Sequence, residues 1–289
     1  MTGTLHGMRG MFVTGSLGAG DLVNDGRLRV RGAAARTFGP RTGQVLNPTM
    51  RGYVRDLAAP YGIAVREDLL DEGAGHSYVE MCLPLLAELV PEDRPADLLV
   101  LATGVPDIRY GRSTATVLSW HCAGAPMAFT VCDQGVLAAF TALRLIDGYA
   151  RTGGCQRAVL LVAEQPVLYH ELPEPAPVPD RAAAVGVVLE MAGAGEPLSV
   201  RRHPEVTPDE AYDALAADLT GLSGDPEVIL GAGLTGTGDG QPSTGVWLEL
   251  SRRLGDVPDG GQVLVADYDP ALRCLFSVSV DVRAATVDM

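Results

Sequence analysis

The chain has 289 residues, 47% of them hydrophobic, and a mean hydropathy of +0.15. These values supply ample material for a large core and exclude a disordered chain. One compact unit and two fused halves are both compatible with this length. The 36 acidic residues outnumber the 22 basic ones, which gives a formal net charge of −14. Because such a surface repels a phosphate backbone, we expect no nucleic acid partner.

Cysteine usage favours a reducing compartment. The five cysteines lie in apolar stretches without paired spacing, at Cys82, Cys122, Cys132, Cys155 and Cys274. We expect each to be a small buried hydrophobic residue rather than part of a disulfide framework. No metal-ligand spacing occurs among histidines and cysteines, so we expect neither a metal nor a cofactor. No leader-like segment and no window of about 18 apolar residues occurs, which predicts a soluble, cytoplasmic protein without a membrane segment.

Short apolar runs alternate with helical patterns along the chain, which is typical of an α/β protein with buried strands. Strands are predicted at 11–14, 98–102, 127–131, 158–163, 184–189, 228–230, 263–266 and 275–282. Helices are predicted at 49–61, 78–89, 114–121, 137–150, 208–219 and 245–254. Ser77 and Ser113 are expected to cap the helices that follow them. The proline-rich segment 171–180 predicts a stiff loop. The glycine-rich segments 15–21 and 231–240 match no complete phosphate-binding fingerprint and predict tight turns.

Two pairs of segments resemble each other. "ADLLVLATGVPD" (96–107) is similar to "PEVILGAGLTG" (226–236), and "RAVLLVAEQP" (157–166) is similar to "GQVLVADYDP" (261–270). Such self-similarity indicates a duplicated architecture, with a shorter second copy. We therefore expect two similar halves, 1–193 and 194–289, joined by a connection at 190–210.

The order of motifs in the middle of the chain resembles a known family. A strand ends in a small-residue turn (103–107), a helix opens on "STA" (113–115), a long helix contains "ALRLIDGY" (142–149), and "DRAAAVGVVLE" (180–190) forms a later strand. This pattern is similar to the thiolase superfamily and, within it, to the β-ketoacyl carrier-protein synthase III group. The resemblance implies a thiolase-like αβαβα layered fold of two similar halves, with the second half shortened.

In that group a cysteine at the start of a buried helix attacks an acyl thioester, helped by a histidine and an asparagine from the second half. Helix-end N–H groups favour the thiolate, and two donors steady the thioester oxyanion. The resemblance places Val136, Gly231 and Gln241 at the cysteine, histidine and asparagine positions. A shift of one residue would bring Gly135 or Leu137 to the first position, and neither is a nucleophile. The resemblance therefore implies that the catalytic set is lost.

Two residues offer an alternative chemistry. Cys132 ends the strand before the expected nucleophile turn, and His170 follows "AEQPVLY", where chains of the family run near the pocket or the subunit interface. A nucleophile needs a base within hydrogen-bond reach. Asp133 is adjacent to Cys132, but neighbours on an extended chain point to opposite faces, which makes it a poor base. We therefore expect Cys132 to be a packing residue and His170 to have a structural or interface role.

Subunits of the family pair through the strand before the nucleophile, so the resemblance implies an interface at Met127, Phe129, Val131 and Cys132. A retained fold without its catalytic set predicts a non-catalytic subunit beside an active synthase III-like subunit, in a heterodimer or heterotetramer. The acyl thioester would lie in the partner's pocket, and the product would be a fatty-acyl or polyketide-type secondary metabolite. The chain resembles in this respect the inactive subunits of alkylquinolone-synthase-type heterodimers, which lack the catalytic set and pair with an active condensing subunit. Three alternatives stay open. The chain could form a homodimer, it could be an active acyltransferase that uses Cys132 or His170, or it could be an acyl-CoA or acyl-carrier binding protein.

Overall fold

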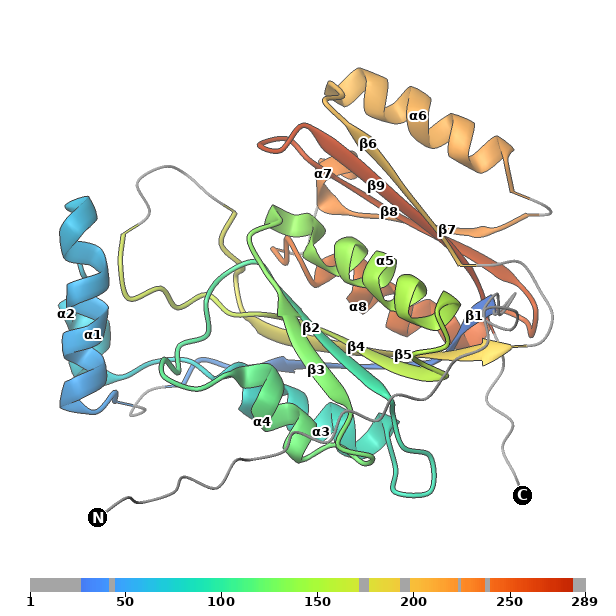
Figure 1. Ribbon diagram of the computed structural model, residues 1–289. Coiled ribbons are helices and arrows are strands. Elements are labelled where there is room, and N and C mark those ends of the chain that lie inside the picture. The colour runs from blue at the N-terminus through green and yellow to red at the C-terminus, as the bar shows by residue number, and fades with distance from the viewer. Residues whose placement is uncertain are drawn as a thin grey trace, which may run out of the picture.

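The computed structural model describes residues 27–41, 45–171, 177–192, 198–222, 225–236 and 240–282. Two β-sheets alternate with three layers of helices, as the sequence predicts (Figure 1). The predicted strand at 11–14 and the glycine-rich segment 15–21 lie outside the described residues. No helix in the described part of the chain is long and apolar enough to cross a membrane.

The first sheet has the strand order β1-β5-β4-β2-β3. Its members are β1 (Arg27–Phe38), β2 (Leu98–Thr103), β3 (Met127–Val131), β4 (Arg157–Glu164) and β5 (Ala182–Ala192). β2 runs parallel to both β3 and β4, whereas β5 runs antiparallel to β4 and β1. β2 and β4 are buried along their whole length, which explains their continuous apolar sequences. β3 forms one edge of this sheet and β1 the other.

The second sheet has the order β6-β9-β8-β7. Its members are β6 (Ser199–Pro204), β7 (Glu227–Leu230), β8 (Gln262–Asp269) and β9 (Cys274–Asp281). β7 and β8 are parallel, and the other neighbours are antiparallel. The boundary between the predicted halves stays a prediction.

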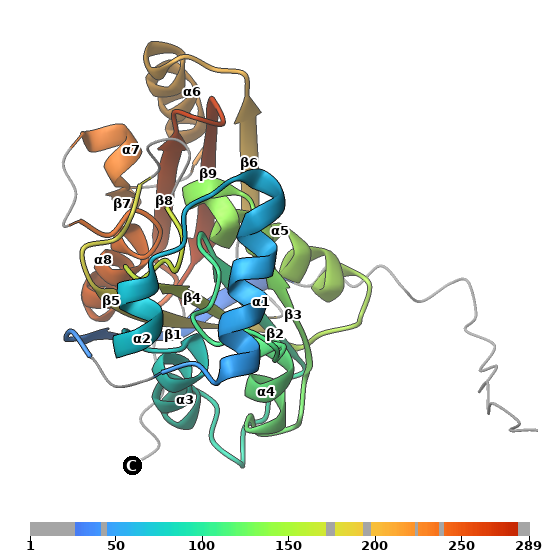
Figure 2. The ribbon, with the colours of Figure 1, turned by 90° about the vertical axis from the view of Figure 1, so that its left-hand side faces the viewer.

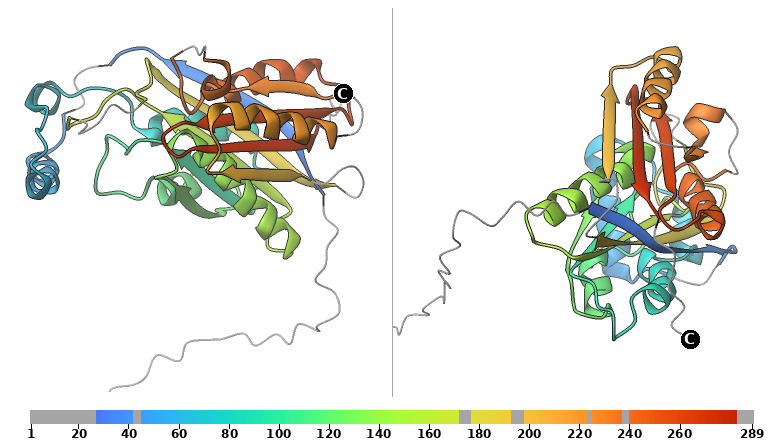
Figure 3. Two further views of the ribbon diagram at one scale, coloured as in Figure 1. Left: turned by 90° about the horizontal axis from the view of Figure 1, so that it is seen from above. Right: turned by 90° about the vertical axis from the view of Figure 1, so that its right-hand side faces the viewer.

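Helices cover both sheets and fill the space between them (Figures 1 and 3). α3 (Tyr78–Leu89) and α4 (Thr114–Trp120) lie on the outer face of the first sheet, while α6 (Pro208–Thr220) and α7 (Ala232–Thr235) lie on the second sheet. α5 (Ala138–Arg151) and α8 (Gly245–Arg253) pack between the two sheets. α1 (Pro48–Ala58) continues into a 3-10 turn (Ala59–Tyr61) and, with α2 (Glu67–Glu72), stands apart from the layers (Figure 1). Both helices face the viewer in Figure 2.

All six predicted helices occur, and Ser77 and Ser113 cap two of them as expected. Every predicted strand within the described residues also occurs. The predictions for 231–240 and 190–210 were wrong in part, because α7 forms in the first segment and β6 in the second. β1, which no pattern predicted, reads "RLRVRGAAARTF" and lacks a run of large apolar residues. It is an edge strand and needs a partner on one side only, so its sequence is under weaker constraint.

The core between the sheets is centred on Phe140, in the first turn of α5. Phe140 is fully buried, and its ring lies 5.2 Å from that of Trp247 on α8 and 5.8 Å from that of Phe276 on β9. These three aromatic side chains join α5, α8 and the second sheet. The first turn of α5 therefore packs against a filled hydrophobic core.

Candidate functional site

The turn between β3 and α5 is sharp. Asp133 and Gly135 have φ angles of 59° and 53°, in the left-handed region, so the chain turns sharply before the 3-10 turn Gly135–Leu137 leads into α5. Val136 stands within that turn, at the entrance of the buried helix. An aliphatic side chain at this point provides no nucleophile.

A carboxylate from the second sheet occupies the space in front of this helix. Asp269, the last residue of β8, accepts the backbone N–H of Val136 on Oδ2 at 3.1 Å. Its Oδ1 accepts the N–H groups of Ala271 and Leu272 at 2.9 and 3.0 Å. A Cβ at Gly135 would lie 2.0 Å from Asp269 Oδ2, so only glycine fits there. The donor that a helix start would offer to an anionic intermediate is already bound to a fixed anion.

A second carboxylate fills the place of the expected histidine. A Cβ at Gly231 would lie 2.0 Å from the Cγ atom of Asp267, so no side chain can be accommodated at this position. Asp267 Oδ1 accepts the N–H groups of Gly233 and Tyr268 at 3.0 and 2.8 Å. Burial raises the pKa of Asp267 to about 7, against these two hydrogen bonds. Burial thus favours the neutral form of this carboxyl group more than water does.

Gln241, at the expected asparagine position, has a structural role. It is 2% exposed, and its Nε2 donates to Glu164 Oε1 at 2.9 Å and to the carbonyl oxygen of Arg181 at 3.0 Å. Glu164 ends β4 and also accepts the N–H groups of Ser243 and Thr244 at 2.8 and 2.9 Å. Burial raises the pKa of Glu164, although these donors act in the opposite direction. The amide of Gln241 therefore ties the segment before α8 to the end of β4 and the start of β5.

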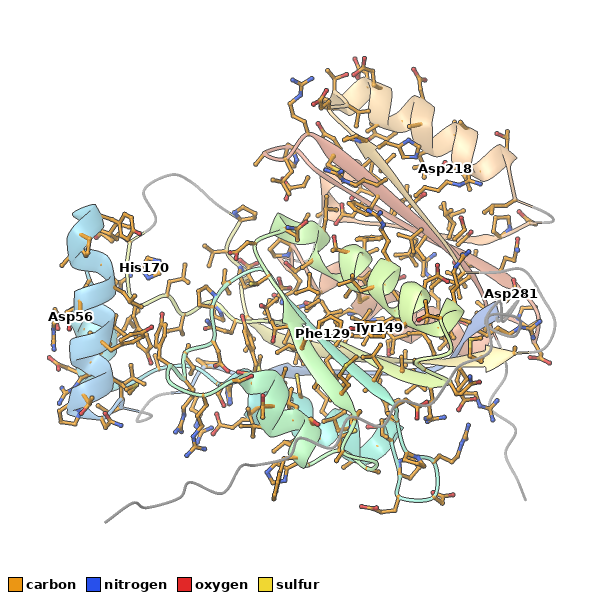
Figure 4. All side chains as sticks on the ribbon, viewed as in Figure 1. Asp56, Phe129, Tyr149, His170, Asp218 and Asp281 are labelled. Atoms are coloured by element: carbon orange, nitrogen blue, oxygen red, sulfur yellow. The ribbon has the colours of Figure 1, made fainter. Side chains whose placement is uncertain are left out.

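A small cavity lies beside these groups. Its volume is about 190 Å³, and its lining includes Val136, Glu164, His170 and Ser243. The backbone of His170 bridges to Val65, in the chain between α1 and α2, and His170 lies beside α1 (Figure 4). Pockets that hold small-molecule ligands usually measure about 300–1,000 Å³. The volume of this cavity lies below that range.

Cys132 differs from the expectation in two respects. It is exposed instead of buried, and its Sγ donates to Asp133 Oδ2 at 3.3 Å. The argument that the two side chains point to opposite faces was wrong because Asp133 adopts a left-handed conformation, not an extended one. The hydrogen bond to Asp133 raises the pKa of the Cys132 thiol, with smaller contributions from burial and from the negative charge. Since the thiolate is the nucleophile, this neighbour lowers reactivity. The other four cysteines are buried, as predicted.

The predicted interface residues lie on the free edge of the first sheet. Met127 is 48% exposed, whereas Phe129 is half-buried and stacks on Tyr149 of α5 with 6.0 Å between the rings (Figure 4). Val131 is buried, and Cys132 is exposed just beyond the strand. Trp120 at the end of α4, which packs against β3, is 84% exposed. An apolar edge strand with an exposed tryptophan beside it is typical of a surface that another chain covers.

Sequence reasoning located the turn but missed the acids that fill it. Asp267 and Asp269 stand two residues apart at the end of an apolar strand, so both point to one face of the sheet. This pair of aspartates at the end of an apolar strand was the sequence signal that could have predicted buried carboxyl groups here. No group of three or more metal-ligating side chains occurs within the described ranges.

No family model and no curated protein matches this sequence. Among solved structures, AbyA1, described as a tetronic acid condensing enzyme, is 18% identical, with a TM-score of 0.59, 88% of this chain covered and 99% of that chain. The acyltransferase ChlB3 is 15% identical, with a TM-score of 0.58 and coverages of 90% and 99%. The 3-oxoacyl-[acyl-carrier-protein] synthase III of Aquifex aeolicus VF5 is 14% identical, with a TM-score of 0.57 and coverages of 88% and 99%. OleA of Xanthomonas campestris is also among the matches. The chain thus has the thiolase-like αβαβα fold of synthase III-type condensing enzymes.

Proposed function

We propose that this chain is a non-catalytic subunit of a heteromeric synthase III-like condensing enzyme. The observation that carries the proposal is the Asp269 carboxylate on the N–H group of Val136. In a condensing enzyme of this fold, an anionic oxygen develops in front of the corresponding helix. A fixed negative charge already occupies that position here, and like charges at hydrogen-bond distance oppose each other strongly.

The other two positions support the same function. Gly231 leaves no room for an imidazole because Asp267 lies against its Cα atom, and Gln241 is engaged with Glu164. Restoring catalysis would require changes at three positions and the removal of two buried carboxylates. The fold is nevertheless complete around this turn, which is expected of a subunit whose role is to support another chain.

The partner in this proposal is an active synthase III-like subunit that pairs along β3 and holds the acyl thioester in its own pocket, for the synthesis of a fatty-acyl or polyketide-type secondary metabolite. Strand pairing would satisfy the free backbone groups of β3 and would cover Met127 and Trp120. The exposed apolar side chains at this edge support a heterodimer or heterotetramer, and a homodimer would use the same surface.

Intact-mass spectrometry of the purified chain tests the lost chemistry. After incubation with acyl-CoA thioesters of several chain lengths, we expect no increase in mass, whereas an active synthase III incubated in parallel gains the acyl group. A stable acyl adduct on any residue of this chain would refute the proposal.

Co-expression with full-length synthase III-like proteins, one at a time, tests the partner. We expect one of them to copurify with this chain, and we expect Phe129→Asp to abolish copurification because it places a charge in the paired edge. The matched control is Tyr212→Asp, a half-exposed aromatic residue on α6, far from this edge. If both variants lost copurification equally, the proposed interface along β3 would be contradicted.

A second candidate function is acyl transfer assisted by His170, because this imidazole lines the cavity beside Val136. Under this candidate the chain would accelerate thioester cleavage and lose that activity in His170→Gln. An active Cys132→Ala variant would separately exclude a covalent route through the thiol. The third candidate, an acyl-CoA or acyl-carrier binding protein, is disfavoured at this cavity by its volume of about 190 Å³.

A further inference from the structure

We propose that a second, larger cavity is a binding site for an amphipathic carboxylate, meaning an apolar body that carries one anionic head group. The cavity lies where β1 ends and β5 begins, and its volume is about 610 Å³. That volume falls within the range of small-molecule sites, unlike the cavity of about 190 Å³ beside Val136. This inference goes beyond the proposed function and does not depend on it.

The larger cavity is separate from the degenerate condensing site. It is lined by residues from four segments, 37–41, 74–76, 166–167 and 180–182. The smaller cavity is lined by other residues of the same neighbourhood, among them Glu164, Leu168, His170 and Pro179, and the two share no lining residue. The chain that follows β4 and the chain that precedes β5 therefore form a wall between the two cavities. A ligand in the larger cavity does not reach Val136.

Hydrogen bonds hold the walls of the larger cavity in place. The N–H of Gly75 donates to the carbonyl oxygen of Arg41 at 2.9 Å, and His76 Nε2 lies 3.0 Å from the carbonyl oxygen of Gly39. On the other side, the N–H of Asp180 donates to the carbonyl oxygen of Gly240 at 2.7 Å. A cavity held in this way needs little ordering on binding, which favours affinity.

Much of the lining suits an apolar body. The rings of Phe38 and His76 lie 5.3 Å apart and form one wall, and Ala74 and Val167 contribute aliphatic surface. Gly75 has a φ of +76°, and a Cβ there would lie 3.0 Å from Val167 Cγ2. Glycine thus allows the two walls to approach closely. Burying hydrocarbon or an aromatic ring against these groups is favourable.

The charged lining residues favour an anionic head group. Arg41 and Arg181 contribute guanidinium groups, and Asp180 is the only acidic residue among the described residues of the lining. The Asp180 carboxylate is packed against Gly240, where a Cβ would lie 1.8 Å from its Oδ2. Arg41 already pairs with Glu80 at 3.1 Å, yet a guanidinium has five donors and can serve a second acceptor. Two arginines against one aspartate among these lining residues favour an anionic head group over a cationic one.

Isothermal titration of the full chain with three probes tests the ligand class. Decanoate, decanol and decyltrimethylammonium have the same hydrocarbon chain but an anionic, a neutral and a cationic head. We expect decanoate to bind at one equivalent and at least ten times more tightly than the cation. Absence of saturable decanoate binding, or equal binding of the cation, would overturn the proposal.

Two pairs of variants test the location. Ala74→Trp fills the larger cavity and should weaken decanoate binding more than tenfold, whereas Leu168→Trp fills the smaller one and should leave it unchanged. Arg181→Gln should weaken decanoate binding about ten- to a hundredfold without affecting decanol. Its matched control is Arg36→Gln, an exposed arginine on β1 outside the lining. Circular dichroism verifies that each variant folds. If Ala74→Trp does not fold, Arg181→Gln still tests the location of the site.

If Arg36→Gln weakened decanoate binding as much as Arg181→Gln, the ligand would not bind in this cavity and the assignment would be refuted. Weaker binding in Leu168→Trp but not in Ala74→Trp would refute it as well. Failure of the proposed function would instead be seen as an acyl adduct in the mass spectrum, so the two outcomes are distinguishable.

Discussion

Replacing Asp267 with asparagine should stabilise the protein at neutral and alkaline pH. Burial raises the pKa of this carboxyl group from 3.8 to about 7 in the folded chain. Because the folded pKa is the higher one, the folded state binds the proton more tightly than the unfolded state. The contribution of Asp267 to stability is therefore greatest at low pH and falls as the pH rises from about 4 to about 7.

The structure gives the magnitude of this effect. A shift of about three units corresponds to about 4 kcal/mol, at 1.36 kcal/mol per unit, which is the upper limit of what the charge costs above pH 7. Both N–H groups that Asp267 accepts are bound by Oδ1, so asparagine can keep both hydrogen bonds. Its amide N–H groups replace Oδ2, and leaving them unpaired costs about 1–3 kcal/mol. We expect a net gain of about 1–3 kcal/mol at pH 8 and no gain at pH 4.

Urea unfolding followed by circular dichroism between pH 4 and pH 8.5 measures the difference between the two proteins. The difference should grow with pH across the window and level off above pH 7. Asp225→Asn, at an exposed position, is the control and should show no trend. A difference that is independent of pH, or an asparagine variant that is less stable at pH 8, would refute the reasoning.

Further predictions concern the turn, the core and the thiols. Gly135→Ala combines a positive φ with a Cβ 2.0 Å from a carboxylate oxygen, and should lower the free energy of unfolding by about 2 kcal/mol or more. Gly148→Ala, which has open space within α5, should raise it by about 0.5–1 kcal/mol. Phe140→Ala should lower it by about 3–5 kcal/mol, whereas Tyr61→Ala, at a 79% exposed side chain, should change it by less than about 0.5 kcal/mol. Urea titrations measure all four, and a Gly135 variant as stable as the Gly148 one would contradict the geometry. With a thiol reagent, only Cys132 should react quickly in the native protein, and rapid loss of a second thiol would contradict its sole exposure.

The sequence predicts the fold well wherever periodicity is strong. The continuous apolar runs of β2 and β4 and the amphipathic pattern of α5 identify buried strands and a helix between sheets. It predicts β1 and β6 poorly, because edge strands are constrained on one side only and carry arginines. α7 is short, and its formation depends on Asp267, a residue far along the chain.

The candidate site likewise contains features that the local sequence predicts and features that depend on distant contacts. That Val136 offers no nucleophile in the turn before α5 follows from the local sequence. The contact of Asp269 with this turn does not, because Asp269 reaches it from the opposite sheet. The exposure of Cys132 also escaped prediction, since it depends on a left-handed Asp133 that no residue preference signals. Long-range polar contacts thus account for most of what the sequence leaves undetermined.

The two edges of the first sheet differ in charge, and this difference limits how the protein can assemble. β1 carries three arginines beyond its first residue, Arg29, Arg31 and Arg36, whereas β3 reads "MAFTV" and has no charged residue. Charges on an edge strand oppose the addition of another strand, and an uncharged edge accepts one. In the proposed function a partner strand would therefore be added at β3, and a single strand would complete that edge. A chain with one such edge would terminate the assembly it joins, which would favour closed pairs over fibres.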